Sequence, residues 1–401
     1  MSIDVPQVRF RGFEDAWEQR KLGELVEIGD IDHRMPPTLD DGIPYLMTGD
    51  FCGINELNFD GVKYVSQEDY EQLSRKIKPE KGDIIFARYA SVGAVRYVDF
   101  TKDFLISYSC AIIKQSKKID SKYLYHYLTG NTAQKQINLE INSSSQANIG
   151  IDSMKNSITV LLPSADEQTK ISEFFSDLDN LITLHQRKYE KFVNIKKSML
   201  EKMFPRKGAR VPEIRFKGFT DEWEQRKLGD VAQFVNGRAY SQDELLDDGK
   251  YKVLRVGNFY TNDSWYYSDL ELENKYYADD GDLLYTWSAT FGPHIWFGGK
   301  VIYHYHIWKV LLSDALEKKF AVQLLEHDKA NIMSDKNGST MVHITKAGME
   351  QKLVYVPKSI EEQKSVGAFL SNLDNLITLQ QRKVEKLKAI KTTMLNKMFP
   401  D

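Results

Sequence analysis

Leu178-Asp179-Asn180-Leu181-Ile182-Thr183-Leu184 returns without change as Leu373-Asp374-Asn375-Leu376-Ile377-Thr378-Leu379. Each copy of this heptapeptide lies between the same flanking triplets. An acidic pair followed by glutamine precedes it, at residues 166–168 and 361–363, and Met-Phe-Pro follows it, at residues 203–205 and 398–400. Chance does not produce ordered blocks of this kind twice, so we infer an internal duplication with a domain-sized period.

The repeated block has the apolar periodicity of a long helix. Apolar residues recur at three- and four-residue spacing, and proline or glycine closes each segment at Pro205, Gly208 and Pro400. A helix this long needs a partner along its apolar seam, and the obvious partner is its twin. The seam residues predicted from the pattern are Phe174, Leu178, Leu181, Phe192 and Ile195 in the first helix, and Phe369, Leu373, Leu376, Leu387 and Ile390 in the second.

Two polar features of these helices each admit two interpretations. His185 and Gln380 interrupt the apolar seam, either because the seam is partly exposed there or because they set the register of the pair. Lysines crowd the C-terminal halves, Lys196 and Lys391 among them, where they suit the helix dipole as a solvated face or contact DNA or a partner subunit.

A second shared block opens each copy. Residues 5–13 return as residues 211–219 with conservative changes, and Trp17-Glu18-Gln19-Arg20-Lys21-Leu22-Gly23 returns unchanged at residues 223–229. The domain boundaries that follow are 1–165 for a first globular domain, 166–205 for a first long helix, 206–358 for a second globular domain and 359–401 for a second long helix.

The centres of the two copies differ far more than their ends. They share a skeleton, seen at residues 82–86 and 281–285, where Gly-Asp enters an apolar strand. A common frame with unlike centres indicates one task performed twice on different targets, and neutral drift of a redundant copy is the alternative. The fold class we predict is α+β, with two similar domains and two long helices in a pseudo-two-fold repeat.

Composition excludes several classes of protein. The 401 residues are 42% hydrophobic, but no run is long enough to cross a membrane, and we expect no signal peptide and a cytoplasmic location. The two cysteines, Cys52 and Cys110, cannot build a disulfide framework or a zinc cluster, and we expect both to be buried thiols. A net charge of −3 counts mildly against a nucleic-acid partner, although a basic face can coexist with acidic surfaces.

Motifs of catalysis are missing from the sequence. It has no phosphate-binding loop, no dinucleotide fingerprint, no nucleophile elbow and no metal-ligand spacing. His304-Tyr305-His306 alternates as a strand does, so we read its histidines as structural and expect no metal. An enzyme of an unfamiliar type stays open, since carboxylates are plentiful.

Recognition is better represented than catalysis. Aromatic residues make up 12% of the chain, and polar, aromatic and basic residues cluster just after each skeleton strand. Such side chains read base edges or bind phosphates, although ordinary loop composition would look similar for any one residue. The DNA-contact candidates are Arg88, Tyr89, Ser91, Arg96, Ser144, Gln146 and Asn148 in the first copy, and Trp287, Ser288, Thr290, Lys336, Ser339 and His343 in the second.

The whole plan resembles the specificity subunit of type I restriction–modification enzymes. The residues that carry this resemblance are the doubled Trp-Glu-Gln-Arg-Lys-Leu-Gly openings, the Gly-Asp turns at 82–88 and 281–285, the approach from Asn148-Ile149 to residues 160–163, and the acidic–Gln start of a helix ending in Lys-Met-Phe-Pro. The second copy departs at His343, where the first has Asn148, and at Thr286-Trp287, where the first has Ala87-Arg88.

The resemblance implies two target-recognition domains, each followed by a helix, with the two helices packed antiparallel. It also implies double-stranded DNA as ligand, with two modification subunits and two motor–nuclease subunits as partners. S-adenosylmethionine, ATP and magnesium would belong to those partners, and this chain would hold no cofactor and catalyse nothing. Because the recognition domains differ, the target would be bipartite and asymmetric. A bivalent protein–protein adaptor with the same architecture is the alternative, and the negative net charge fits it slightly better.

Overall fold

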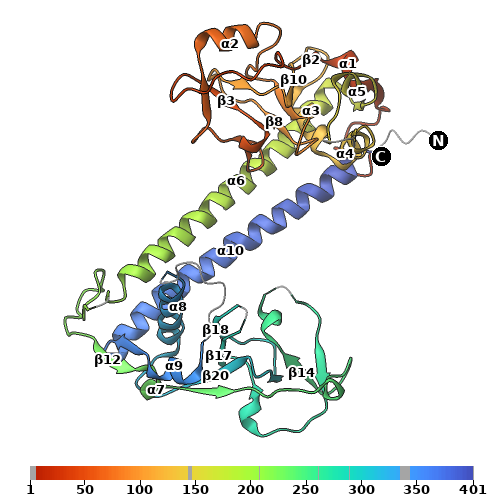
Figure 1. Cartoon of the computed structure of the whole chain (residues 1–401). Helices are drawn as coiled ribbons and strands as arrows, with labels where there is room; N and C mark the ends of the chain where they lie inside the picture. Colours follow the sequence, from red (N-terminus) through yellow and green to blue (C-terminus); the bar gives the residue numbers. More distant parts are fainter. Residues whose placement is uncertain are drawn as a thin grey trace. The chain divides into compact units, whose positions relative to one another are not determined.

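The computed structural model describes residues 6–142, 147–206, 208–260, 262–288, 290–334 and 344–400. The chain forms two compact units (Figure 1). Unit 1 contains Met1–Lys188 together with Gln380–Asp401, and unit 2 contains Tyr189–Leu379. Both units mix helices with sheets, which confirms the predicted α+β class.

Unit 1 is built on a four-stranded antiparallel sheet of order β2-β10-β7-β8. A smaller sheet, β6-β3-β9, has one parallel pair, and β1 pairs with β11. The elements are β1 (Glu18–Lys21), α1 (Leu22–Leu25), β2 (Ile28–Gly29), β3 (Ile43–Leu46), η1 (Thr48–Asp50), β4 (Phe51–Cys52), β5 (Glu56–Leu57), β6 (Lys63–Val65), α2 (Gln67–Leu73), β7 (Ile84–Ala87), β8 (Val95–Tyr97), β9 (Leu105–Ile106), β10 (Cys110–Ile113), α3 (Ser121–Thr129), α4 (Asn131–Leu139), α5 (Ile151–Asn156) and β11 (Thr159–Leu162).

Unit 2 repeats the same plan. Its central antiparallel sheet has the order β13-β20-β17-β18, its second sheet the order β15-β14-β19-β16, and β12 pairs with β21. The elements are β12 (Glu224–Lys227), α7 (Leu228–Val231), β13 (Ala232–Asn236), η2 (Gln242–Glu244), β14 (Tyr251–Leu254), η3 (Val256–Phe259), β15 (Tyr266–Ser268), η4 (Asn274–Tyr276), β16 (Tyr277–Ala278), β17 (Leu283–Thr286), β18 (Gly292–Ile295), β19 (Val301–Tyr303), β20 (Ile307–Leu312), α8 (Lys318–Ser334), α9 (Lys346–Gln351) and β21 (Leu353–Val356).

Each central sheet is apolar on both faces, which explains the continuous apolar runs at residues 84–86 and 283–285. Ile84 and Phe86 of β7 face one core cluster, and Ile85 between them faces another. Successive side chains of a strand point to opposite faces, so a strand buried on both faces shows no polar alternation.

The duplicated block at 166–205 and 359–401 forms the long helices α6 (Ala165–Lys202) and α10 (Ile360–Met398). Each helix contributes one half to each unit. Within unit 1 they run antiparallel, because Asp179 of α6 pairs with Lys391 of α10 while His185, later in α6, contacts Gln380, earlier in α10. The distance from His185 Nδ1 to Gln380 Oε1 is 2.6 Å, which favours the register interpretation of these two residues.

Several seam residues lie where the helical pattern predicts them. Leu178 and Leu373 are buried in the cores, and Phe174, Phe192, Ile195, Phe369 and Leu387 pack against those cores. Leu181, Leu376 and Ile390 do not, since they are 43%, 37% and 37% exposed. The apolar stripe of each helix is wider than the part that the other helix covers. The prediction that these three residues lie in the seam is therefore wrong.

Two lysines of the helices have a structural role that the sequence did not reveal. Lys391 pairs with Asp179 in unit 1 at 2.5 Å, and Lys196 pairs with Asp374 in unit 2. The two pairs occupy equivalent positions of the repeat. They are therefore duplicated bonds between the helices, not part of a solvated lysine face.

The Met-Phe-Pro triplets anchor the helix ends in the domain cores. Phe399 stacks on Phe175 with ring centroids 5.8 Å apart, and its ring meets Tyr127 edge-on at 5.3 Å. Phe204 takes the same place in unit 2, stacked on Phe320 at 5.5 Å and edge-on to Trp223 at 5.8 Å. Each globular core therefore includes the end of a long helix.

The repeated opening and the acidic–Gln triplet are joined by one buried polar cluster. Arg9 donates to both carboxylate oxygens of Glu167 at 2.7 and 2.8 Å, and Trp17 Nε1 donates to the same carboxylate. Arg215, Glu362 and Trp223 repeat this arrangement in unit 2. The sequence identity of these blocks thus reflects how each long helix begins against its domain.

The cysteine prediction is wrong for one residue. Cys110 is buried, and burial raises the pKa of its thiol to about 12, but Cys52 is exposed. Cys52 ends β4, whose burial pattern is half-buried then exposed, so the short β4–β5 hairpin leaves it at the surface.

Candidate nucleic-acid interface

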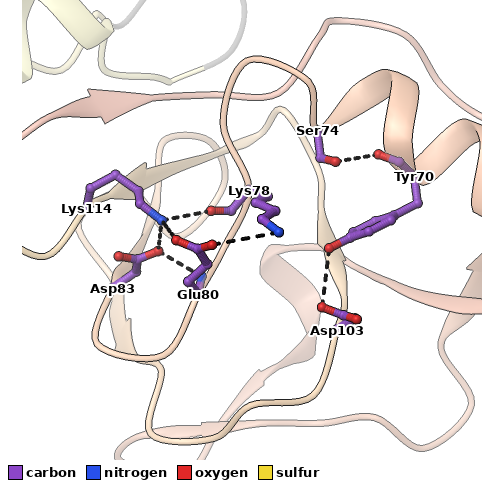
Figure 2. A network of polar contacts seen from close by, with 7 residues as sticks. All are labelled: Tyr70, Ser74, Lys78, Glu80, Asp83, Asp103 and Lys114. Atoms are coloured by element: carbon purple, nitrogen blue, oxygen red, sulfur yellow. Dashed lines mark hydrogen bonds and ion pairs between the residues drawn. The ribbon is translucent and has the colours of Figure 1, made fainter.

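The shared Gly-Asp turns fix the start of the strands that lead to the candidate residues. Asp83 accepts hydrogen bonds from the backbone N–H groups of Glu80 and Gln115 and from Lys114 Nζ at 2.6 Å, as Figure 2 shows in part. Gly82 precedes it with φ +98°, a conformation that favours glycine. Asp282 accepts from Asp279 N and Lys309 Nζ in the same way.

Arg88 follows β7 and is buried. Its Nη1 pairs with the carboxylate of Asp30, and its Nε donates to the carbonyl of Ile149 at 3.0 Å. A guanidinium bound in this way within the protein is poorly placed for a bidentate bond to guanine. The geometry argues that Arg88 positions the neighbouring segments and does not itself read a base.

Tyr89, Ser91 and Asn148 are brought together at the end of β7. Tyr89 forms a β-bridge with Asn148, Ala90 has φ +59°, and Ser91 is exposed. A left-handed alanine is uncommon and marks a constrained turn. The turn holds Ser91 at the surface, so these residues stay DNA-contact predictions.

Arg96 lies on β8 and is bonded to backbone. Its Nε donates to Glu56 O at 3.1 Å and its Nη2 to Gly53 O at 3.3 Å, and the guanidinium lies 5.1 Å from the ring centre of Phe51. These contacts hold the β4–β5 hairpin. Base contact by Arg96 would require those bonds to break, which makes a structural role the better account.

In unit 2 the strand β17 leads to Trp287. The indole stacks on Trp308 with centroids 5.7 Å apart, and its Nε1 donates to Tyr305 O at 2.9 Å. Ser288 is half-buried beside it, and Thr290 is exposed. Trp287 is therefore fixed, with part of its surface accessible. Ser144, Gln146, Lys336, Ser339 and His343 lie outside the described residues.

Sequence reasoning missed the turns that face these strand ends. Tyr108 stacks on His33 at 5.0 Å in unit 1, and His33 Nε2 lies 2.8 Å from Asp30, the partner of Arg88. Tyr305 occupies the equivalent turn in unit 2 and is 39% exposed. The available signal was positional, because each tyrosine lies two residues before the strand that pairs with β7 or β17.

A buried histidine beside this edge makes the stability of unit 2 depend on pH. Burial lowers the pKa of His294 to about 4, and its ring stacks on Phe259 at 4.2 Å. The unfolded chain binds a proton near pH 6.5 and the folded chain does not, so stability falls as pH drops from 7 to 5, by about 2 kcal/mol at pH 5 for this residue. Urea unfolding at pH 7 and at pH 5 measures this fall in the free energy of unfolding. We expect the fall to be smaller in His294→Gln than in the wild type, and an equal fall in the two proteins would contradict the prediction.

Metal and membrane binding find no support in the described ranges. In them, no group of three or more His, Cys, Asp or Glu side chains is placed to hold a metal ion. None of the helices built from those residues combines the length and apolar character needed to cross a bilayer.

Comparison with known proteins defines the class of this chain. The family model for the type I restriction modification DNA specificity domain matches residues 14–192 and again residues 220–389. The chain therefore belongs to this family, whose members are the non-catalytic subunits that recognise DNA targets for restriction–modification enzymes. The two matches coincide with the two copies of the internal repeat.

Individual relatives cover nearly the entire chain. The type I restriction enzyme MjaVIII specificity subunit of Methanocaldococcus jannaschii is 24% identical over 419 residues, which cover 95% of this chain and 92% of the relative. The crystal structure of the type I S subunit from Mycoplasma genitalium matches with a TM-score of 0.69 at 16% identity, covering 99% of both chains. A type I chain solved in work on complex assembly and conformational transition matches with a TM-score of 0.54 at 16% identity, covering 97% of this chain and 98% of that chain.

Proposed function

We propose that this chain reads a bipartite, asymmetric DNA site, one half with each recognition domain, on behalf of a type I restriction–modification complex. The observation that carries the proposal is the duplicated frame with unlike edges. Units 1 and 2 share the same central sheet order, yet Arg88 bound to Asp30 stands where Trp287 stacked on Trp308 stands in the other unit. Because the two units share a sheet order, they can bind DNA in the same orientation. Because their residues at the strand ends differ, each can recognise a different half-site.

The helices support the second part of the proposal, which is docking of partner subunits. Leu181 and Leu184 are 43% and 47% exposed, and their counterparts Leu376 and Leu379 are 37% and 46% exposed. Exposed leucines at the same positions of both copies indicate two equivalent apolar docking patches. We infer two modification subunits there, which would supply S-adenosylmethionine chemistry, and two motor–nuclease subunits using ATP and magnesium.

Exchange of one recognition domain tests the reading of two half-sites. Residues Leu46–Ser157 are replaced by the matching segment of another specificity subunit, and methylated adenines are mapped in cells that carry the partner subunits. We expect one half-site to change and the other to stay. A change in both would contradict independent reading, and methylation without sequence preference would remove DNA specificity itself.

The salt dependence of binding distinguishes DNA reading from the alternative of a protein–protein adaptor. DNA binding releases counterions, so affinity for the mapped duplex should fall steeply between about 50 and 200 mM salt. A complex with the partner subunits that forms equally well with any DNA, or without DNA, and shows no such slope would favour the adaptor.

A further inference from the structure

The turns at residues 107–109 and 304–306 have the same backbone setting in the two units. Cys110 N donates to Ser107 O, and Ile307 N to His304 O, both at 2.9 Å. The residue after the skeleton strand bonds to the end of each turn, Arg88 N to Ser109 O and Trp287 N to His306 O. The turns therefore stand at equivalent points beside the divergent ends of β7 and β17.

The central residue of both turns is tyrosine, and the flanking residues differ. Tyr108 lies between the buried Ser107 and the half-buried Ser109, and Tyr305 lies between two histidines. Tyr305 is 39% exposed although its neighbours Ile307 and Trp308 are buried. A shared centre with exchanged flanks is the pattern expected where one contact is common to both half-sites and the others choose the bases.

The histidines present neutral rings on this turn. Their ring centroids are 4.8 Å apart, and the ring of His306 meets Trp287 edge-on at 5.0 Å. Burial lowers the pKa of His304 to about 4 and also lowers that of His306. His304 Nδ1 accepts from His306 N, which leaves the proton of the neutral ring on Nε2, where it is a hydrogen-bond donor.

We propose that the turns 107–109 and 304–306 are the base-reading elements of the two domains. The hydroxyl of Ser109 in the first turn and the imidazoles in the second bond to base edges, while the buried Ser107 supports the first turn by accepting from Ser109 N. The tyrosine hydroxyl contacts the sugar–phosphate backbone in both turns. This inference rests on the proposed function and names the residues that set each half-site.

The test uses the full chain reconstituted with its modification subunits, with methylation mapping as the readout. We expect His304→Ser with His306→Ser to reduce discrimination at the second half-site by at least about tenfold and to leave the first half-site intact. Ser109→His should alter only the first. Tyr305→Phe should weaken binding to the cognate duplex without changing either half-site.

Controls separate this inference from the function on which it rests. Phe297→Ser changes an aromatic residue that is 74% exposed after β18, at the end of the β17–β18 hairpin opposite Trp287, and should alter neither half-site. His304 is partly buried, so the double variant could disturb folding. The single variant His306→Asn, which leaves His304 in place, is therefore measured in parallel, and far-ultraviolet circular dichroism checks that each variant is folded. A specific wild-type complex whose folded turn variants keep both half-sites would overturn the inference, whereas a wild type without sequence preference would overturn the proposed function.

Discussion

Replacing Phe399 with alanine is expected to destabilise unit 1 by about 3–5 kcal/mol, the usual cost of removing a buried phenylalanine ring. The ring is 1% exposed and lies within 6.4 Å, centroid to centroid, of Trp17, Tyr123, Tyr127 and Phe175. Tyr123 and Tyr127 belong to α3 and Phe175 belongs to α6, so removing the ring leaves a cavity between these helices. Hydrogen exchange read by mass spectrometry measures the loss in each unit separately.

Matched variants sharpen this expectation. Phe204→Ala should weaken unit 2 instead, since Phe204 is the equivalent residue in that core. Leu139→Ala, at a residue of unit 1 that is 85% exposed, should change stability by less than about 0.5 kcal/mol. Protection lost equally from both units in the Phe399 variant would contradict the assignment of this ring to unit 1.

The second large effect concerns the buried bond between the helices. Lys391→Met leaves the carboxylate of Asp179 without its cation, and both side chains are only 12% exposed. Breaking such a pair costs about 3–5 kcal/mol. Burial already raises the pKa of Asp179, so the folded state binds a proton more tightly than the unfolded state. The difference between variant and wild type should therefore be greatest at neutral pH and smaller toward pH 5.

The equivalent pair in unit 2 provides the control. Asp374 is 40% exposed, so Lys196→Met should cost no more than about 1 kcal/mol. Replacing both partners in unit 1, Asp179→Leu with Lys391→Met, should be neutral or stabilising by about 1–4 kcal/mol, because no charge then remains buried. Urea unfolding of the wild type, the two single variants and the double variant measures these free energies of unfolding. Equal losses in the two single variants would show that the exposure of an ion pair does not determine the cost of breaking it.

The fold could be predicted from sequence because its signals are local and repeated. The apolar spacing of residues 166–205 specifies a helix, and the duplication specifies a second one. The site was less accessible, because an arginine reads alike whether it faces solvent or a buried carboxylate. Arg88 was chosen as a DNA contact, and only the fold shows Asp30, far away in sequence, bound to it.

The same limit applies to Lys391, whose partner lies on the other helix, and to Tyr108 and Tyr305, which a pairing of strands brings beside the candidate loops. Periodicity tells which face of a helix is apolar, but it does not tell how much of that face a single partner covers. Leu181 and Leu376 lie on the apolar face and were therefore assigned to the seam, although the other helix does not cover them.

The capture of Phe399 by unit 1 has a consequence for the order in which the protein is made. Unit 2 is one continuous stretch, Tyr189–Leu379, and can close as soon as that stretch has left the ribosome. Unit 1 must wait for Leu395, Met398 and Phe399, which belong to its core. The recognition domain that is synthesised first is thus completed last. Until then, the apolar surfaces of Trp17, Tyr123 and Phe175 that Phe399 covers remain exposed and can form non-native contacts. A released chain that ends at Leu379 should therefore contain a folded second domain and an incomplete first one.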